Sequence, residues 1–168
     1  SIVAMEEPKE EGSRGIHDSQ YNLLSKLVPI TNVNDSLVMA QYEGYLDEEN
    51  ISKDSKTETY AALKLFIDNE RWQGVPFFIR TGKKMGGRET QVVVQFKAVG
   101  DIPGNVLIIK IQPDEGVYFQ FNAKKPGTEQ ELQQISLDFC QSCILENRIN
   151  TPEAYERLLD ACFRGDRA

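Results

Sequence analysis

The chain has 168 residues, of which 40% are hydrophobic, and its formal net charge is −7. This length and apolar content suit one ordinary domain with a buried core. The negative charge opposes general binding to nucleic acids or acidic membranes, and no stretch approaches the run of about 20 apolar residues that spans a bilayer.

The start of the chain is expected to be a connecting segment. Residues 1–5 are apolar and are typical of a last helical turn, while residues 6–15 are charged and contain Pro and Gly. Such a stretch buries little surface, so a solvated arm is expected. The sequence is therefore divided into 1–16, a helix end with a charged arm, and 17–168, a folded domain.

A short helix, an extended segment and a loop are expected next. Asp18 is a residue type that caps helices, and Tyr21, Leu24 and Leu27 then form an apolar stripe. Residues 38–45 are typical of extended structure. The polar run 47–56 predicts a surface loop.

The middle of the chain predicts successive strands. Residues 59–68 contain Ala and Leu, which suit a helix, but their apolar positions alternate, and we favour a strand. Residues 113–116 contain Pro and Gly and predict a hairpin turn. Further strands are expected at 76–80, 91–98, 106–112, 117–122 and 135–139.

The end of the chain predicts a helix. Thr151, Pro152 and Glu153 supply a capping hydroxyl, a proline for the first helical position and an acid for the first turn. Helices near both ends and hairpins between them predict the α+β class, with a large, mainly antiparallel sheet and helices on one face. Both faces of 59–68 are apolar, so we expect the other face to contact a second chain in a dimer.

A basic turn is the first candidate site. Arg80, Lys83, Lys84 and Arg88 follow one another through Gly82, Gly86 and Gly87. Glycines let a ligand approach the backbone while long basic side chains reach over it. Spacing alone also fits a solvated hairpin tip, since no P-loop pattern is present.

Two other motifs are interpreted as structural. Cys140 and Cys143 have the spacing of a redox or zinc motif, but only Cys162 and His17 remain as further ligands. Three cysteines do not make a disulfide framework, which favours a reducing cytoplasm. Trp72 is expected to fix a tight turn to the core, with Arg71 paired near Glu70.

Several stretches together resemble one family. They are VAMEEP at 3–8, QYEGYLDE at 41–48, TYAALKLFIDNERWQGVPFFIRTGKKM at 59–85, IIKIQPDEGVYFQFNAKKPG at 108–127 and TPEAYERLLDACFRGD at 151–166. In this order they are similar to the C-terminal β+α domain of glucose 6-phosphate dehydrogenase. The resemblance implies a domain truncated at both ends.

The resemblance implies an NADP-dependent enzyme that oxidises glucose 6-phosphate at C1 in the oxidative pentose phosphate pathway. In that family the NADP is held mainly by an N-terminal nucleotide-binding domain, and a histidine in an R-I-D-H-Y-L-G-K type of motif is the base. Neither feature is in these residues, so this fragment alone is expected to be inactive.

The resemblance assigns substrate contacts to Lys83, Arg88 and Gln112. These positions match the lysine of R-x-GK, the basic residue five positions later and the glutamine before Pro113. A second, structural NADP is not expected, because the family's basic positions hold uncharged or acidic residues here. Those positions are Glu89, Val93 and Gln120, and only Arg80, Lys110 and Tyr118 remain of the set.

The expected partners are glucose 6-phosphate and a second copy of the chain, bound through the sheet, with no nucleic acid and no membrane. The expected compartment is the cytoplasm. The alternative is a non-catalytic interaction module that keeps the same scaffold and associates through its sheet.

Overall fold

The computed structural model describes residues 1–113, 115–127, 131–140 and 154–165. The chain forms two compact units, and each is described by itself. The first unit contains residues 1–85 together with the last residues from 161, and the second contains residues 86–160.

Helix α1 (Ser13–Leu24) supplies the core of the first unit. Leu23 is buried against Ala4 and Ile67, and Trp72 and Phe77 pack around this cluster. The helix begins before the expected start, so Asp18 lies inside it and does not cap it. Its N-cap is Gly12, which makes no side-chain capping bond, so the sequence carries no start signal there.

Gly15 explains how the charged segment meets α1. A Cβ atom at this buried position would lie 1.9 Å from the Glu10 carbonyl oxygen. The glycine therefore lets the backbone around residue 10 cross directly over the helix. The segment expected to be a solvated arm thus passes into α1, and the expected boundary after residue 16 falls within the helix.

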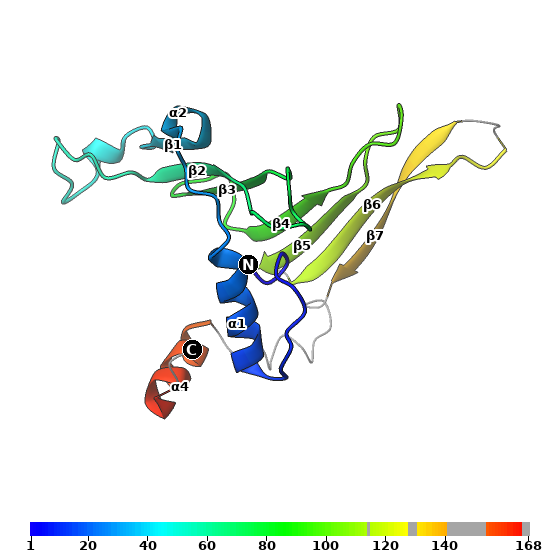
Figure 1. The fold of residues 1–168 in the computed structure, drawn as a ribbon. Coiled ribbons are helices and arrows are strands. Elements are labelled where there is room, and N and C mark those ends of the chain that lie inside the picture. Colours follow the sequence, from blue (N-terminus) through cyan, green and yellow to red (C-terminus); the bar gives the residue numbers. More distant parts are fainter. Residues whose placement is uncertain (114, 128–130, 141–153, 166–168) are drawn as a thin grey trace. The chain divides into compact units, whose positions relative to one another are not determined.

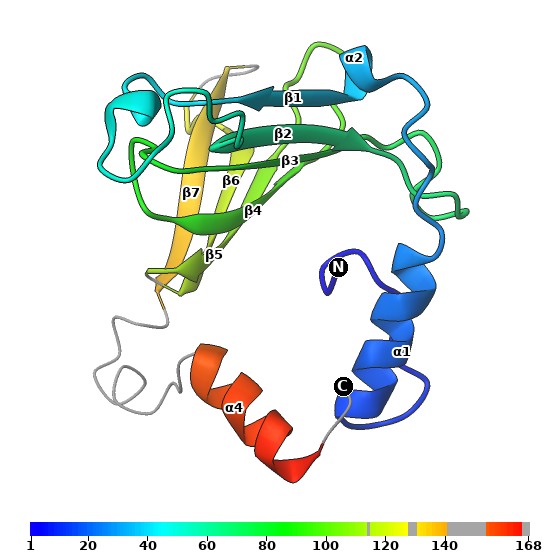
Figure 2. The same ribbon diagram turned by 90° about the vertical axis from the view of Figure 1, so that its left-hand side faces the viewer.

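Three antiparallel strands form the sheet of the first unit. They are β1 (Leu37–Ala40), β2 (Tyr60–Leu65) and β3 (Phe77–Gly82), with β2 in the middle. Figure 2 shows them side by side. The strand expected at 59–68 is confirmed, and all its residues in β2 are half-buried. A short helix α2 (Val33–Ser36) precedes β1, and a 3-10 turn η1 (Tyr45–Asp47) follows it.

Four antiparallel strands form the sheet of the second unit. In sequence and in space they run β4 (Thr90–Gln95), β5 (Val106–Gln112), β6 (Gly116–Lys124) and β7 (Leu132–Cys140) (Figure 1). Lys110 pairs with Gly116, which confirms the hairpin between β5 and β6.

The register makes one face of this second sheet apolar. Val94, Leu107, Phe119 and Leu137 lie in one row across the four strands. The adjacent row, on the opposite face, contains Gln95, Val106, Gln120 and Ser136. The ring of Phe119 contacts Phe96 and Phe121, with centroids 6.3 and 5.5 Å apart, so aromatic packing reinforces the apolar face.

The last element is helix α4 (Ala154–Arg164). Its expected capping residues, Thr151 to Glu153, lie outside the described residues. Tyr155 and Leu159 on this helix are exposed. No helix within the described ranges is long and apolar enough to cross a membrane.

The expected α+β class with antiparallel strands is confirmed, since the strand pairs in the described part of the chain are all antiparallel. In place of one large hydrogen-bonded sheet, the strands form two sheets, one in each unit.

Candidate functional site

The basic turn begins where β3 ends. Gly82 pairs with Tyr60, and the backbone N–H of Lys83 donates to the carbonyl of Thr59 over 2.8 Å. A Cβ atom at Gly82 would lie 2.9 Å from the Tyr60 ring and 3.0 Å from the sulfur of Met85. The strand end is therefore packed closely, and the chain leaves it at a fixed point with Lys83 exposed.

Lys83 and Arg88 both carry a positive charge that no described residue pairs with. Both side chains are exposed, and neither forms an ion pair or a side-chain hydrogen bond with any residue that the structure describes. Flexible cations of this kind are available to bind an anionic group.

Lys84 behaves differently from its neighbour. Its ammonium pairs with the Glu48 carboxylate and lies 4.6 Å from the centre of the Tyr42 ring. The Tyr42 hydroxyl donates to the same carboxylate over 3.2 Å. These three residues, Tyr42, Glu48 and Lys84, are called the clamp below.

The clamp residues shift one another's pKa values. The hydrogen bond and charge of Lys84 lower the pKa of Glu48, and the hydrogen bond to Glu48 raises the pKa of Lys84. Partial desolvation and the nearby carboxylate raise the pKa of Tyr42. Across neutral pH the carboxylate and the ammonium are therefore charged, and the phenol is protonated.

Arg88 and Gln112 belong to the second unit. Thr90, two residues after Arg88, pairs with Gln112, and the register shifts between Thr90 and Gln91. The structure therefore brings the start of β4 and the end of β5 together, with Gln112 exposed there. Lys83 belongs to the first unit.

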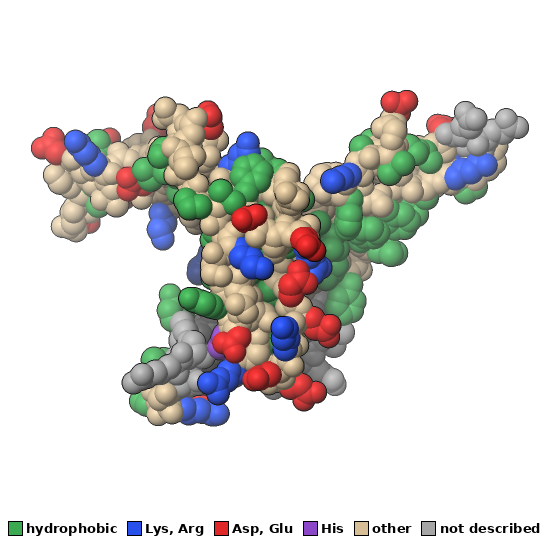
Figure 3. All heavy atoms as spheres, viewed as in Figure 1, with side chains coloured by type: hydrophobic (Ala, Val, Ile, Leu, Met, Phe, Trp, Pro, Cys, Tyr) green, Lys and Arg blue, Asp and Glu red, His purple; other side chains and the backbone are tan. Residues whose placement is uncertain are grey.

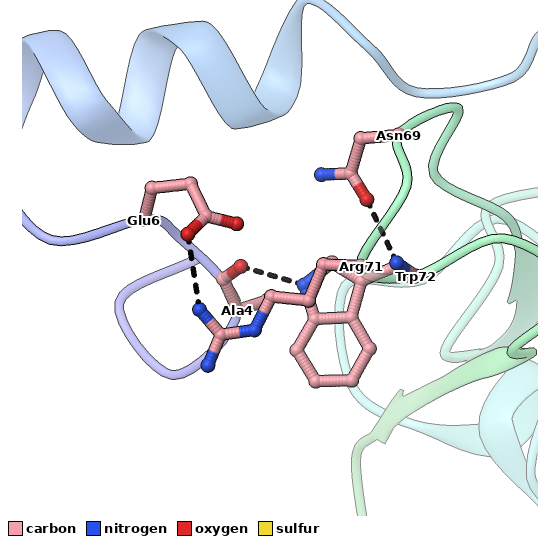
Figure 4. A network of polar contacts seen from close by, with 5 residues as sticks. All are labelled: Ala4, Glu6, Asn69, Arg71 and Trp72. Carbon is pink, nitrogen blue, oxygen red and sulfur yellow. Dashed lines mark hydrogen bonds and ion pairs between the residues drawn. The ribbon is translucent and has the colours of Figure 1, made fainter.

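The expectation that Trp72 fixes its turn to the core is confirmed (Figure 4). The indole N–H of Trp72 donates to the Ala4 carbonyl over 2.7 Å, and its backbone N–H donates to the side chain of Asn69 over 2.8 Å. The expected pairing of Arg71 near Glu70 is wrong, because Arg71 pairs with Glu6 at 3.2 Å. That partner lies 65 positions away in the sequence, where local spacing gives no signal.

The cysteine motif lies only partly within the described residues. No group of three or more His, Cys, Asp or Glu side chains there could hold an ion. Cys140 is disulfide-bonded, and Cys162 is free and exposed. His17 is half-buried on α1. Cys143 lies outside the described residues.

Comparison with protein families gives one match over the whole chain. The model for "Glucose-6-phosphate dehydrogenase, C-terminal domain" matches residues 1–168. Among curated proteins, the glucose-6-phosphate 1-dehydrogenase of Bacillus subtilis is 41% identical and aligns with 99% of this chain. The cytoplasmic isoform of Solanum tuberosum is 37% identical over 98% of this chain.

Solved structures give the same result. A glucose-6-phosphate dehydrogenase in complex with its substrate glucose-6-phosphate has a TM-score of 0.81 and 37% identity over 98% of this chain. The enzyme from Mycobacterium avium has a TM-score of 0.78 and 32% identity. The chain spans 38% of the Bacillus protein, 33% of the Solanum protein and 36% of each solved chain.

Proposed function

The chain belongs to the family of the glucose-6-phosphate dehydrogenase C-terminal domain, and from this membership we propose that it is the substrate-binding and dimerisation part of an enzyme that oxidises glucose 6-phosphate to 6-phosphogluconolactone. The match over residues 1–168 is the observation that carries the proposal. A relative solved with glucose-6-phosphate, at 37% identity, supports the substrate.

Lys83, Arg88 and Gln112 are the proposed substrate contacts. The two cations are exposed and unpaired among the described residues, so substrate binding would break no existing ion pair. Charge-assisted hydrogen bonds from Lys and Arg suit the oxygens of a sugar phosphate. Gln112 can donate and accept, as a sugar hydroxyl requires.

The proposed reaction removes a hydride from C1 of the sugar while a base takes the proton of the O1 hydroxyl, and NADP accepts the hydride. These 168 residues contain one histidine, His17. It lies on α1 within the first unit, and no feature makes it the base. As the family resemblance implies, we assign the base and the main NADP contacts to the nucleotide-binding domain of the full-length enzyme, and residues 1–168 alone should be inactive.

The test is an assay of the full-length protein that contains these residues. Glucose 6-phosphate and NADP should yield reduced cofactor, seen in its near-ultraviolet absorbance. Removing one charge-assisted contact costs about 1.5–3 kcal/mol, so Lys83→Ala and Arg88→Ala should each lower kcat/KM by roughly one to two orders of magnitude. Lys53→Ala, which removes an exposed ion pair with Asp47, is the control. An inactive wild-type protein would contradict the proposal.

A structural NADP site is not part of the proposal. The side chains at Glu89, Val93 and Gln120 do not fit a phosphate-rich ligand, because none is cationic. Gln120 instead donates to Gln134 over 3.0 Å. The 168-residue chain, purified by itself, should therefore release no nucleotide on denaturation.

Association through the sheets is proposed as well. Val38 and Met39 on β1 and Phe78 and Ile79 on β3 are exposed and lie on both faces of the first sheet. The alternative function, a non-catalytic interaction module, shares this association and differs by lacking activity in the full-length protein. The cytoplasm is the proposed compartment, in line with the cytoplasmic isoform of Solanum tuberosum.

A further inference from the structure

Two neighbouring lysines in the basic turn have opposite surroundings. Lys83 is exposed and has no side-chain partner among the described residues, whereas Lys84 lies in the clamp. Two adjacent lysines therefore differ in their contacts with the rest of the protein. The one already committed to a protein carboxylate is the poorer candidate for binding a ligand.

The backbone of Lys84 supports this distinction. Its φ angle is 49°, in the left-handed region that residues other than Gly seldom adopt. Such a conformation persists only when surrounding contacts hold it. The side chain of Lys84 makes two such contacts, the ion pair with Glu48 and the position of its ammonium over the Tyr42 ring.

Thr59 connects the clamp to the basic turn through two hydrogen bonds. Its hydroxyl accepts a hydrogen bond from the backbone N–H of Tyr42 over 2.9 Å. Its carbonyl accepts one from the backbone N–H of Lys83 over 2.8 Å. The turn is therefore attached at two points, through the backbone of Lys83 and through the side chain of Lys84. Both attachments lead to Tyr42.

We propose that Lys84 is a positioning residue, which fixes the turn through Glu48 and Tyr42 so that Lys83 points at the substrate. The proposal rests on the proposed function, because it assigns the fixed turn to the binding of glucose 6-phosphate. Preorganised groups bind more tightly, since less freedom is lost on binding.

The test separates positioning from direct binding by changing the partner of Lys84. In the full-length protein, Lys84→Gln and Glu48→Gln should each raise the KM for glucose 6-phosphate by about an order of magnitude and leave the KM for NADP unchanged. If Lys84 were itself a substrate ligand, Glu48→Gln would free its charge and leave the KM unchanged or lower. That result would overturn the proposal.

Two further variants refine the measurement. Lys84→Arg keeps the charge and can stack on Tyr42, so it should stay within about twofold of the wild type. Lys53→Gln, in another exposed ion pair of the same unit, should have no effect. A loss of kcat with an unchanged KM in Lys84→Gln would indicate a merely structural role and would also overturn the proposal.

A second readout does not depend on catalysis. In the 168-residue chain, Lys84→Gln should speed hydrogen exchange at the Lys83 amide several-fold, because one of the two attachments is lost. Unchanged exchange would contradict the attachment. An inactive wild-type enzyme would instead contradict the proposed function, so the two failures are distinguishable.

Discussion

Trp72 makes one polar contact through its side chain and one through its backbone. The indole N–H donates to the Ala4 carbonyl, and the backbone N–H donates to Asn69. The ring also meets Phe77 edge-on, with centroids 5.2 Å apart. One side chain therefore joins the start of the chain to the turn before β3 and to the core.

Replacing this residue by Phe should destabilise the chain. Trp72→Phe keeps an aromatic ring but leaves the Ala4 carbonyl without its donor, which costs about 1–2 kcal/mol. Lys53→Gln is the control, because the exposed pair of Lys53 with Asp47 contributes about 0–1 kcal/mol and does not involve Trp72. Urea unfolding followed by circular dichroism measures both. An equal loss in the two variants would contradict the role of the indole bond.

At the scale of the element, the end of β3 depends on a residue without a side chain. Gly82 has no room for a Cβ atom between Tyr60 and Met85, whereas a Cβ atom at Gly87 meets nothing within 4 Å. Neither glycine has a positive φ, so the difference between them is one of space and not of backbone strain.

Gly82→Ala should therefore lower the free energy of unfolding by about 1–3 kcal/mol, as overpacking does. Gly87→Ala should leave it unchanged or raise it slightly, since alanine restricts the unfolded chain. Denaturation of both variants under one set of conditions gives the comparison. Similar destabilisation by the two would show that the packing at Gly82 is not limiting.

The strands could be predicted because their signals are local. The alternation in 59–68 and the Pro and Gly of 113–116 are signals between neighbours in sequence, and the strand and the hairpin between β5 and β6 were confirmed. The start of α1 was missed because it lacks a cap and depends on the crossing at Gly15. The clamp was missed because Lys84 and Glu48 are 36 positions apart.

For the candidate site, the sequence separated Lys83 from the other basic residues only through the family resemblance. Spacing treats Lys83 and Lys84 alike, because it does not show which lysine already has a carboxylate partner. The structure adds that information: Lys84 is paired, and Lys83 is not paired within the described residues. The substrate role of Lys83 stays a prediction until the variants are assayed.

At the scale of the whole molecule, the second sheet has an apolar face that the described residues of its unit leave partly exposed. No described residue between 86 and 160 is buried. Leu137 and Phe139 on β7 are 64% and 57% exposed, which is unusual for neighbours on one sheet face. Hydrophobic side chains gather over β6 and β7 in this unit (Figure 3). Burying such a face gives about 25 cal/mol for each Å² removed from water, which favours association.

The dimer proposal can be tested with two adjacent positions on β7. Leu137 pairs with Phe119 on the apolar face, and Ser136 pairs with Gln120 on the opposite face. If the apolar face joins two copies, Leu137→Lys should shift the mass measured by light scattering from dimer to monomer, because burying the unpaired ammonium is costly. Ser136→Lys adds the same charge to the same strand and should leave the dimer intact. A dimer that survives Leu137→Lys but not Ser136→Lys would place the contact on the other face, and a wild-type monomer would contradict the association itself.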